Sequence, residues 1–440
     1  MASPDPPETS PWRVAAAGFI GTAIEYYDFF IFGTAAALVF GKAFFPDLSP
    51  TSALLASFAT FAVAFIARPL GAVFFGHFGD RLGRKTMLVA SLLTMGLATV
   101  GVGLLPGYQA IGLWAPALLV LLRLAQGIGL GGEFGGAMIM MTEHAPARRR
   151  GFFAALPQLG PPVGLALSSV TFLLITLVMS PAGFEAWGWR VPFLASALLV
   201  VVGLYVRLSI SESAVFRAVT RRREQARVPL VELLRTQLGR LLLASGPSLL
   251  SSMLFFLITT YALSYGTSVL GVSRPLMLVV VIVVVIVNAL VTVPLGAASD
   301  RIGRRRMVLW GVVGSAVWAV PMFWLVHTRS VVLIALAFSI GIAIYSMIFA
   351  PLGAYLPELF TTRTRYTGTS VAFNLGAMCG GALAPTVATQ LGAATGNAWW
   401  ALSGYVVVVS LIALVGVLKL PETHHSSLGP TDSHVGSTAA

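Results

Sequence analysis

Five charged residues stand out deep within the long apolar stretches of this chain: Glu25, Asp28, Arg68, Arg123 and Glu133. If those stretches cross a bilayer, each charge costs at least about 2.5–3.5 kcal/mol and needs a partner or a function. Glu25 and Asp28 are three residues apart, so a helix would place them on one face. Acids and arginines that are shielded from water can bind and release a proton as their partners change. The pattern therefore predicts a buried proton-binding site.

Asp28 and Arg123 are the two residues that we expect to pair in this site. If the first apolar stretch runs outward and the fourth runs inward, their side chains reach a similar depth. Burial disfavours a charged carboxylate, and a nearby guanidinium favours it. An organic anion that binds Arg123 would therefore leave Asp28 to accept a proton. Our hypothesis is that Asp28 is the coupling acid and that Arg123 alternates between Asp28 and the anion. The alternative is a permanent structural ion pair.

The remaining buried charges each allow two interpretations. Glu25 is a second candidate for proton coupling beside Asp28. Glu133 lies about 15 Å beyond Arg123 on the same predicted helix, among closely spaced glycines, and is a further proton site or a hydrogen-bond partner of another helix. Arg68 either extends toward the lipid headgroups or contacts a carboxylated ligand.

Uncharged polar side chains inside the apolar stretches could line a cavity between the two halves of the chain. A lone amide in a membrane helix also bonds readily to a neighbouring helix, and aromatic residues at helical spacing often serve packing alone. The candidates for ligand contact are Tyr26, Tyr27, Gln126 and Gln158 in the first half, and Tyr261, Tyr265, Asn288, Tyr345 and Asn374 in the second.

The elements that must position these residues are long apolar helices. The chain is 57% hydrophobic and 10% charged, whereas soluble domains carry about 25% charged residues. Each apolar block has roughly 20 residues or more, which is enough to cross the bilayer as a helix. The twelve blocks are 14–40, 54–75, 87–105, 115–141, 152–179, 191–208, 241–270, 276–298, 307–326, 331–356, 367–391 and 399–418. We therefore expect an all-α membrane protein with twelve crossings.

A charged ten-residue string occurs twice, as GHFGDRLGRK at 76–85 and GAASDRIGRR at 296–305. Its aspartates, Asp80 and Asp300, are 220 positions apart in a chain of 440 residues. Glu143 and Glu358, each followed by arginines and a glycine, are 215 apart. Because these two pairs of residues are separated by nearly the same interval, the chain is expected to be an internal duplication. A duplication of twelve crossings predicts two six-helix bundles.

The repeated loops are expected to act as latches that hold one face of the molecule closed. A carboxylate at the end of one helix, beside arginines and the start of the next helix, is stabilised by the helix dipole and by charge-assisted hydrogen bonds. The predicted gating residues are Asp80, Arg81, Arg84, Asp300, Arg301, Arg304, Glu143 and Glu358.

The Lys and Arg residues are distributed unevenly between the loops on the two sides of the predicted membrane. If the N-terminus is cytoplasmic, 22 of the 28 Lys and Arg residues fall on the cytoplasmic side, and four fall outside: Lys42, Arg190, Arg274 and Arg329. The positive-inside rule then places both termini in the cytoplasm. Because the net charge of +12 is spread over these loops, we exclude a nucleic-acid partner. Cys379 is the single cysteine, so no intrachain disulfide is possible.

These observations divide the chain into five regions. We expect a disordered cytoplasmic tail at 1–13, a first bundle at 14–208, a basic cytoplasmic linker at 209–239, a second bundle at 240–420 and a polar cytoplasmic tail at 421–440.

The repeated loop resembles the signature of the major facilitator superfamily, and further strings are similar to its metabolite:H+ symporter family. That family includes transporters of shikimate, 2-oxoglutarate, citrate and proline or betaine. The strings are GTAIEYYDFFIFG at 21–33, ARPLGAVFFGHFGDRLGRK at 67–85, RLAQGIGLGGEFGGA at 123–137, WGWRVPF at 187–193, SESAVF at 211–216 and LPELFTTRTRYTG at 356–368. The resemblance covers essentially the whole chain.

The resemblance implies proton-coupled uptake of a small organic acid or zwitterionic metabolite, by alternating access and without a cofactor. In proton-coupled members of the wider superfamily an acid on the first span faces an arginine on the fourth, as Asp28 and Arg123 would here. The expected partners are that metabolite, protons and the bilayer, in a bacterial-type inner membrane, and we expect a monomer. The alternatives are an exporter or proton antiporter, or a ligand sensor without transport. An enzyme is not expected, because no G-x-S-x-G or H-E-x-x-H string is present.

Overall fold

The computed structural model describes residues 10–208 and 229–426, apart from the side chains of scattered residues inside helices, and every regular element in this part of the chain is helical. Apolar side chains drive these segments into the membrane, and helices satisfy every backbone hydrogen bond there. The elements of the first half are α1 (Pro11–Ala35), the π-helix η1 (Ala36–Phe40), α2 (Gly41–Phe44), α3 (Pro50–Leu82), α4 (Arg84–Leu104), α5 (Tyr108–Ile111), α6 (Trp114–His144), η2 (Ala147–Arg149), α7 (Arg150–Ala155), η3 (Pro157–Leu159), α8 (Gly160–Val178), α9 (Pro181–Ala186), η4 (Gly188–Arg190) and α10 (Val191–Leu208).

The second half repeats this plan and again places a π-helix in its first crossing. Its elements are α12 (Pro229–Thr236), α13 (Leu238–Phe256), the π-helix η5 (Leu257–Tyr261), α14 (Ala262–Ser268), α15 (Arg274–Ile302), α16 (Arg304–His327), α17 (Val331–Leu359), α18 (Arg365–Ala377), the π-helix η6 (Met378–Ala382), α19 (Ala384–Thr395) and α20 (Trp399–Lys419).

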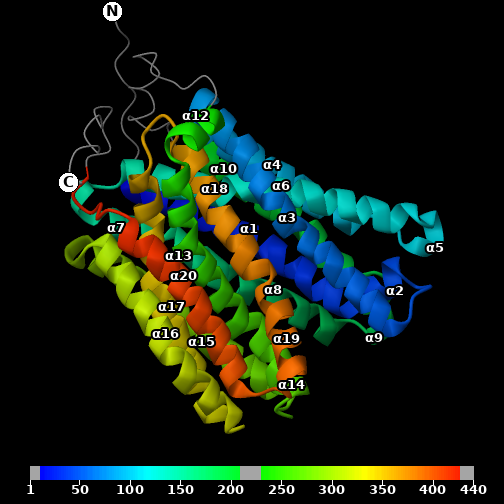
Figure 1. Cartoon of the computed structure of the whole chain (residues 1–440). Coiled ribbons are helices and arrows are strands. Elements are labelled where there is room, and N and C mark those ends of the chain that lie inside the picture. Colours follow the sequence, from blue (N-terminus) through cyan, green and yellow to red (C-terminus); the bar gives the residue numbers. More distant parts are fainter. Residues whose placement is uncertain (1–9, 209–228, 427–440) are drawn as a thin grey trace, which may run out of the picture.

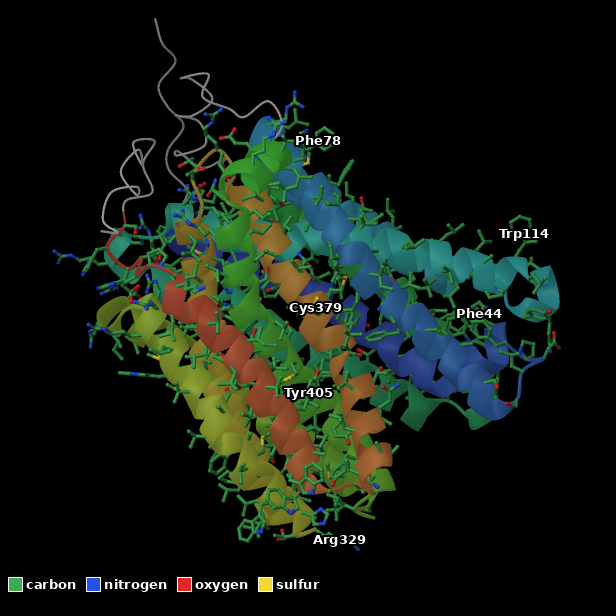
Figure 2. All side chains as sticks on the ribbon, viewed as in Figure 1. Phe44, Phe78, Trp114, Arg329, Cys379 and Tyr405 are labelled. Atoms are coloured by element: carbon green, nitrogen blue, oxygen red, sulfur yellow. The ribbon has the colours of Figure 1, made fainter. Side chains whose placement is uncertain are left out.

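The predicted all-helical membrane fold is confirmed. Eleven helical stretches of the described residues are long and apolar enough to cross a bilayer. The 19-residue α8 lies within the fifth predicted block and provides the remaining crossing. Large apolar side chains such as Leu290, Val317 and Trp310 are more than half exposed on the outer helix faces, as contact with lipid requires (Figure 2).

The two halves meet at the end of the molecule that carries Arg150, Arg304 and Arg365, which we call the basic end. There α7 lies close to the second half, near the place where both chain termini emerge (Figure 1). Away from the basic end the halves diverge, so that α2 and α5 lie far from α14 (Figure 1). Trp114 and Arg329 mark the two separated far ends (Figure 2).

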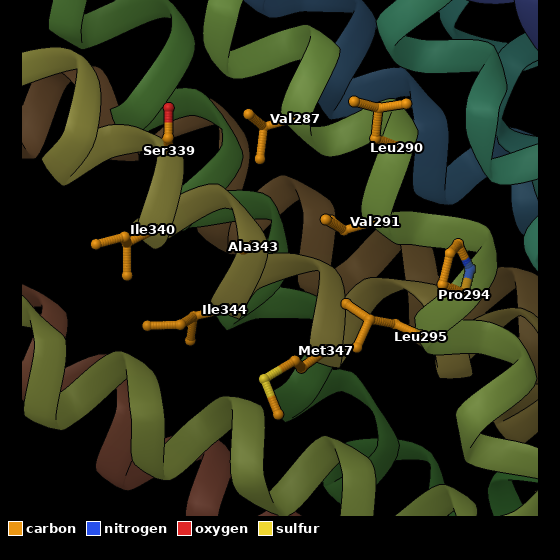
Figure 3. A pocket seen from close by; sticks show the side chains of 10 residues that line it. All are labelled: Val287, Leu290, Val291, Pro294, Leu295, Ser339, Ile340, Ala343, Ile344 and Met347. Atoms are coloured by element: carbon orange, nitrogen blue, oxygen red, sulfur yellow. The ribbon is translucent and has the colours of Figure 1, made fainter.

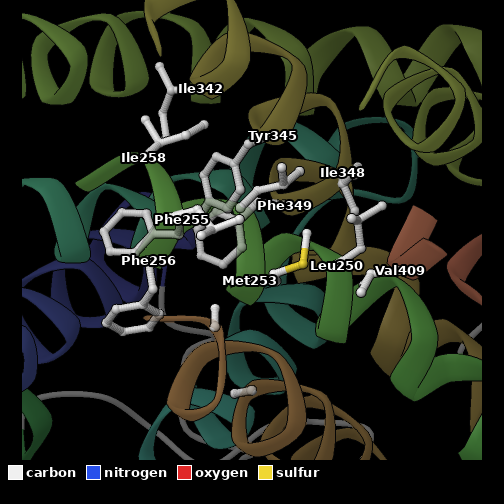
Figure 4. Close-up of a cluster of buried hydrophobic side chains, with 14 of the residues drawn as sticks. Leu250, Met253, Phe255, Phe256, Ile258, Ile342, Tyr345, Ile348, Phe349 and Val409 are labelled. Carbon is white, nitrogen blue, oxygen red and sulfur yellow. The ribbon is translucent and has the colours of Figure 1, made fainter. Parts of the chain in front are cut away.

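Each half has its own aromatic core. In the first half, Phe40 packs against Trp189 and Phe193 with ring centroids 5.4 and 6.1 Å apart. In the second half, the ring of Tyr345 lies 5.7 Å from Phe255 and 5.1 Å from Phe349 (Figure 4). The second core faces the first half, so its aromatic side chains form one wall of the space between the bundles.

The repeated charged string has the same backbone geometry in both halves. Gly83, between α3 and α4, has φ +108°, and Gly303, between α15 and α16, has φ +107°. Glycine adopts this conformation without strain, whereas a residue with a Cβ does not. The last glycine of each string therefore forms the tight turn that joins two crossings.

Three predicted boundaries need correction. Helix α1 begins at Pro11, within the expected disordered tail. The amphipathic α12 lies within the expected linker, and its residues Pro229 and Leu233 are buried. Residues 421–426 pack against the second half, as described below. Residues 1–9, 209–228 and 427–440, to which the other tail and linker predictions refer, lie outside the described residues.

Candidate functional site

A small cavity of about 30 Å³ lies between the two halves. A water molecule needs about 10–15 Å³ of such space, so the cavity holds about two waters and no metabolite until the halves separate. Three predicted ligand contacts, Tyr26, Arg68 and Tyr345, are in its wall. Sequence reasoning missed the other lining residues: Pro161, Ser251, Ser252, Phe255, Phe256, Phe349, Phe373 and Ala377.

Two buried arginines lie close to the ring of Phe29. The guanidinium carbon of Arg68 is 4.9 Å from the ring centroid, and that of Arg123 is 5.3 Å away. Arg123 also lies 3.9 Å from the centroid of Phe32. Cation–π contact stabilises a desolvated cation by about 2 kcal/mol, but it satisfies no N–H donor. The Nε and Nη2 atoms of both arginines have no hydrogen-bond partner in the described part of the structure.

Asp28 is 1% exposed, and its carboxylate is held by two hydroxyl groups. Ser196 Oγ donates to Oδ1 at 2.5 Å, and Thr99 Oγ1 donates to Oδ2 at 3.0 Å. Ser196 and Thr99 were not predicted, because hydroxyl residues are common in membrane helices and no charged neighbour marks these two.

The predicted direct ion pair between Asp28 and Arg123 is wrong for the state that the structure describes. Arg123 Nη1 donates instead to Gln126 Oε1 at 3.0 Å. Helix rise fixes the depth of a residue but not the direction of its side chain. Arg123 faces the phenylalanines of α1 and α3, whereas Asp28 faces α4 and α10.

A chain of side-chain hydrogen bonds nevertheless connects the two charges. Arg123 donates to Gln126, Gln126 Nε2 donates to Thr99 Oγ1 at 2.7 Å, and Thr99 donates to Asp28. All three bonds run in one direction, from the cation to the anion, so each polarises the next. A change at the guanidinium is therefore transmitted to the carboxylate through two neutral side chains.

The other predicted charges near the cavity have different surroundings. Glu25 is 2% exposed, and it interacts electrostatically with Arg68, which also interacts with the Tyr26 hydroxyl. Tyr26 and Arg68 line the cavity, and Glu25 lies behind them in the same electrostatic cluster. Glu133 belongs to α6, but its side chain lies outside the described residues.

The remaining predicted ligand contacts bond to neighbouring helices. Tyr27 Oη donates to Pro192 O at 3.3 Å, and Tyr261 and Tyr265 donate to the backbone near α19. Asn288 accepts from hydroxyls of α15 and α17. Gln158 and Asn374 each donate to a carbonyl of the opposite half. None of these six residues lines the cavity.

Aromatic contact between the halves lies beside the arginines. The ring of Phe256, from the second half, is 6.5 Å from Phe29 and 5.6 Å from Phe65. Because Arg68 lies over the rings of both Phe29 and Phe65, separation of Phe256 from these rings would expose more of its guanidinium to the cavity that it lines.

Two clusters at the basic end contain residues that were predicted to act as latches, and we call them the first and the second latch after that prediction. The first is built on Asp300. Its carboxylate accepts from the backbone N–H groups of Gly151 and Phe152 at 2.8 and 2.9 Å, and it pairs with Arg304 at 2.8 Å. Glu358 lies 3.4 Å from Arg304 and 4.0 Å from Arg150. The carboxylates of Asp300 and Glu358 thus both contact the first half here. Arg301, also predicted to act at this site, is exposed.

Burial lowers the pKa of the Arg150 guanidinium, and the nearby Glu358 carboxylate opposes that shift. Arg150 was not among the predicted gating residues, although the pattern of arginines after Glu143 marked it.

The second latch joins Glu143 of α6 to Arg365 of α18 at 3.0 Å, and both side chains are buried. Beside it, the fully buried Tyr366 fills a notch formed by two glycines. A Cβ added at Gly79 or Gly136 would lie 2.5 Å from the Tyr366 side chain. The side chains of Asp80 and Arg84, predicted to act here, lie outside the described residues, and Arg81 is exposed.

Residues 421–426 close the basic end from the C-terminal side. Glu422 accepts from the backbone N–H groups of Arg304 and Arg305 at 2.8 and 3.1 Å, and so caps α16. Partial burial raises the pKa of the Glu422 carboxyl, but four backbone hydrogen bonds outweigh burial and hold it below its usual value. Arg150 Nη1, from the first half, donates to Ser426 O at 2.7 Å.

A larger hollow of about 570 Å³ lies between α15 and α17 (Figure 3). Ser339 is its one lining residue with a polar side chain, and the others include Leu290, Pro294, Ile344 and Met347. Such a surface suits contact with hydrocarbon and carries no chemistry. In the described residues, no group of three or more His, Cys, Asp or Glu side chains could hold a metal ion.

Comparisons with known proteins agree with this architecture. Residues 18–373 and 279–438 match the sequence model of the Major Facilitator Superfamily. The inner membrane metabolite transport protein YhjE of Escherichia coli is 42% identical over 423 residues, which cover 94% of this chain and 95% of that protein. The shikimate transporter of Escherichia coli is 37% identical over 419 residues, which cover 94% and 95%.

Among solved structures, the proton:xylose symporter XylE of Escherichia coli has the same fold. The match has a TM-score of 0.75 at 18% sequence identity, and it covers 95% of this chain and 97% of that chain.

Proposed function

Because this chain belongs to the Major Facilitator Superfamily, as its motifs predicted, we propose that it takes up a small carboxylated metabolite, an organic acid or a zwitterion, together with protons. The superfamily match and the transporters among its relatives establish the coarser point that the chain is a membrane transporter and not an enzyme.

The observation that carries the proposal is the pair of buried guanidinium groups at the Phe29 ring, that of Arg68, which lines the cavity, and that of Arg123. Arg68 and Arg123 are 4% and 0% exposed, and each has two nitrogen atoms without a hydrogen-bond partner among the described residues. A buried donor without a partner costs about 1–3 kcal/mol. A carboxylate, whose two oxygens match the planar fork of arginine, would satisfy these donors and balance the positive charge.

Coupling to protons would follow from the chain between Arg123 and Asp28. A substrate carboxylate that bonds to Arg123 withdraws the guanidinium from Gln126 and weakens the polarised hydrogen bonds to Asp28. It also adds negative charge to an enclosed site. Both effects favour the protonated form of Asp28. Binding of substrate and binding of a proton therefore favour each other, and such coupling is reciprocal.

Uptake also requires that the cavity open to each side in turn. The latches hold the basic end closed, and rocking of one bundle against the other would open it. The distribution of basic residues assigns this end to the cytoplasm, with both termini. We propose that this chain also lies in an inner membrane, as the name of its relative YhjE states for that protein. We propose further that it is a monomer.

Two steps test the proposal. A thermal-shift screen of the purified protein against carboxylates, betaines and shikimate-like acids identifies a ligand, because a ligand stabilises the native state according to its occupancy. Uptake of that ligand is then measured in proteoliposomes under pH gradients of equal size and opposite sign. We expect accumulation in the direction of proton flow. Accumulation against proton flow would indicate an antiporter, and binding without flux would indicate a sensor.

A further inference from the structure

Two side-chain amides cross the boundary between the halves. Gln158, in η3 of the first half, donates from Nε2 to Phe349 O at 2.6 Å and lies 3.3 Å from Ala350 O. Asn374, in α18 of the second half, donates from Nδ2 to Gly131 O at 3.0 Å. Both side chains are 1% exposed. Each half therefore extends one amide to the backbone of the other.

The two amides hold corresponding places in the duplicated chain. Gln158 comes 15 residues after Glu143, and Asn374 comes 16 residues after Glu358. Their acceptors lie on α17 and α6, the fourth crossing of each half. The two hydrogen bonds are thus reciprocal: the first half donates one amide to the second, and the second half donates one amide to the first.

The pair lies between the cavity and the basic end. The side chain of Phe349 lines the cavity while its carbonyl accepts from Gln158, and Phe373, which also lines the cavity, directly precedes Asn374. One turn further along α17 toward the basic end, Gly353 O accepts from Thr142 at 3.2 Å. The charged latches follow at the surface. The two amide contacts therefore lie between the cavity and the basic end, together with the Thr142 contact, and we call this layer the floor of the cavity.

The chemistry of these bonds suits a contact that breaks and forms repeatedly. A neutral amide–carbonyl bond contributes a net of only about 1 kcal/mol, because water replaces it when the site opens. A charge pair or a packed aromatic ring would close the floor more firmly and release it more slowly.

We infer that Gln158 and Asn374 form a paired amide clasp that closes the floor of the cavity, and that both bonds break each time the cavity opens toward the basic end. The inference rests on the proposed function only for the alternation between two states. It requires no particular substrate and no proton coupling.

The test measures the separation of the halves directly. Spin labels are attached at Arg149→Cys and Arg306→Cys, exposed positions of opposite halves at the basic end, in a Cys379→Ser background. Electron–electron distances are then recorded in lipid nanodiscs without ligand. Because one lost hydrogen bond of this kind shifts an equilibrium by roughly fivefold, Gln158→Leu and Asn374→Leu should each raise the ratio of long to short distances by about that factor. The double variant should raise it about 25-fold.

Asn288→Leu is the matched control. It also removes a buried amide, but the partners of Asn288, Thr292 and Ser346, belong to the same half. We expect no change in its distance distribution. An unchanged distribution in the folded double variant, or an equal change in the control, would overturn the inference. If Gln158→Leu does not fold, Asn374→Leu and the isosteric Asn374→Asp carry the same test.

This measurement separates the inference from the proposed function. A failure of proton-driven uptake would leave the distance result standing. Unchanged distances in protein that still performs proton-driven uptake would overturn the clasp alone.

Discussion

Arg68 in the first half and Asn288 in the second are 220 residues apart, the interval that separates Asp80 from Asp300. Arg68 lines the cavity between the halves and has guanidinium nitrogens without described partners. Asn288, at the corresponding place in α15, is bonded to hydroxyls of its own half and lies away from the cavity. One position of the repeat thus carries a charge that faces the cavity in one copy and a neutral structural amide in the other.

Arg123 and Phe338 show the same difference, at the 215-residue interval that separates Glu143 from Glu358. Arg123 begins the hydrogen-bond chain to Asp28, whereas Phe338 is part of the second apolar core. The duplicated backbone therefore serves two purposes. Near the cavity the first half supplies the buried charges, and the second half provides an aromatic wall.

The largest effect is expected from Asp28→Asn, which removes the ionisable group of the first half and keeps its shape. If Asp28 couples transport to protons, accumulation falls from a maximum of about tenfold per pH unit of gradient to none, while exchange of labelled for unlabelled substrate continues. Both are measured in proteoliposomes. The control is Asp47→Asn, at an exposed aspartate of the same half. Retained accumulation in Asp28→Asn would assign coupling to another acid.

A second prediction compares corresponding positions. Arg68→Gln removes a charge-assisted contact worth about 1.5–3 kcal/mol, so substrate binding should weaken by roughly 10–100-fold. Asn288→Leu should change the affinity for substrate by less than about twofold. Binding is measured by titration of purified protein. Equal losses of affinity in both variants would mean that both halves bind the ligand, which would contradict the proposed difference between Arg68 and Asn288.

A third prediction concerns the latch that Asp300 forms with the first half. Asp300→Asn leaves one carbonyl oxygen where two carboxylate oxygens accept from α7, which weakens closure of the basic end. We expect turnover to fall by about tenfold with little change in substrate affinity, because a bond to a charged group contributes about 1.5–3 kcal/mol. Initial uptake rates and binding are compared with Arg301→Gln, an exposed neighbour. A large loss of affinity would instead place Asp300 near the ligand.

The smallest effect is expected from Glu422→Gln, which tests the C-terminal cap of α16. The pKa of Glu422 is lowered from an ordinary value of 4.5, so its stabilising contribution is present above pH 4.5 and is lost as the pH falls through the lowered value. At neutral pH the variant should be less stable by about 1 kcal/mol, as for other lost helix caps. The difference should disappear in acid. Unfolding temperatures between pH 7 and pH 3 check this, and a difference that persists at pH 3 would exclude the ionised cap as its cause.

The sequence was sufficient to predict the fold because the bilayer restricts what an apolar block of about 20 residues can do. Hydropathy located every crossing, and the interval between Asp80 and Asp300 identified the two halves. It was not sufficient for α12 or for residues 421–426. Helix α12 has only 8 residues. Residues 421–426 are polar, and specific contacts, such as that of Glu422 at the start of α16, hold them in place.

The sequence predicted how deep in the membrane the site residues lie, but not which helices their side chains face. Asp28 and Arg123 are both buried, as expected, but they face different helices, and only three-dimensional packing reveals Gln126 and Thr99 between them. Tyr366 gives a similar lesson. Its ring is ordinary in the sequence, and the notch that receives it exists only where glycines of α3 and α6 meet.

The hydrogen-bond chain from Arg123 to Asp28, confined to one bundle, also has an evolutionary consequence. An ancestral homodimer of six-helix subunits would have repeated any such chain around its twofold axis, with two copies or none. Gene fusion removes that restriction, since each copy can then mutate separately. A single hydrogen-bond chain of this kind is thus attainable only after the two copies have become free to differ in sequence, as the two halves of this chain do.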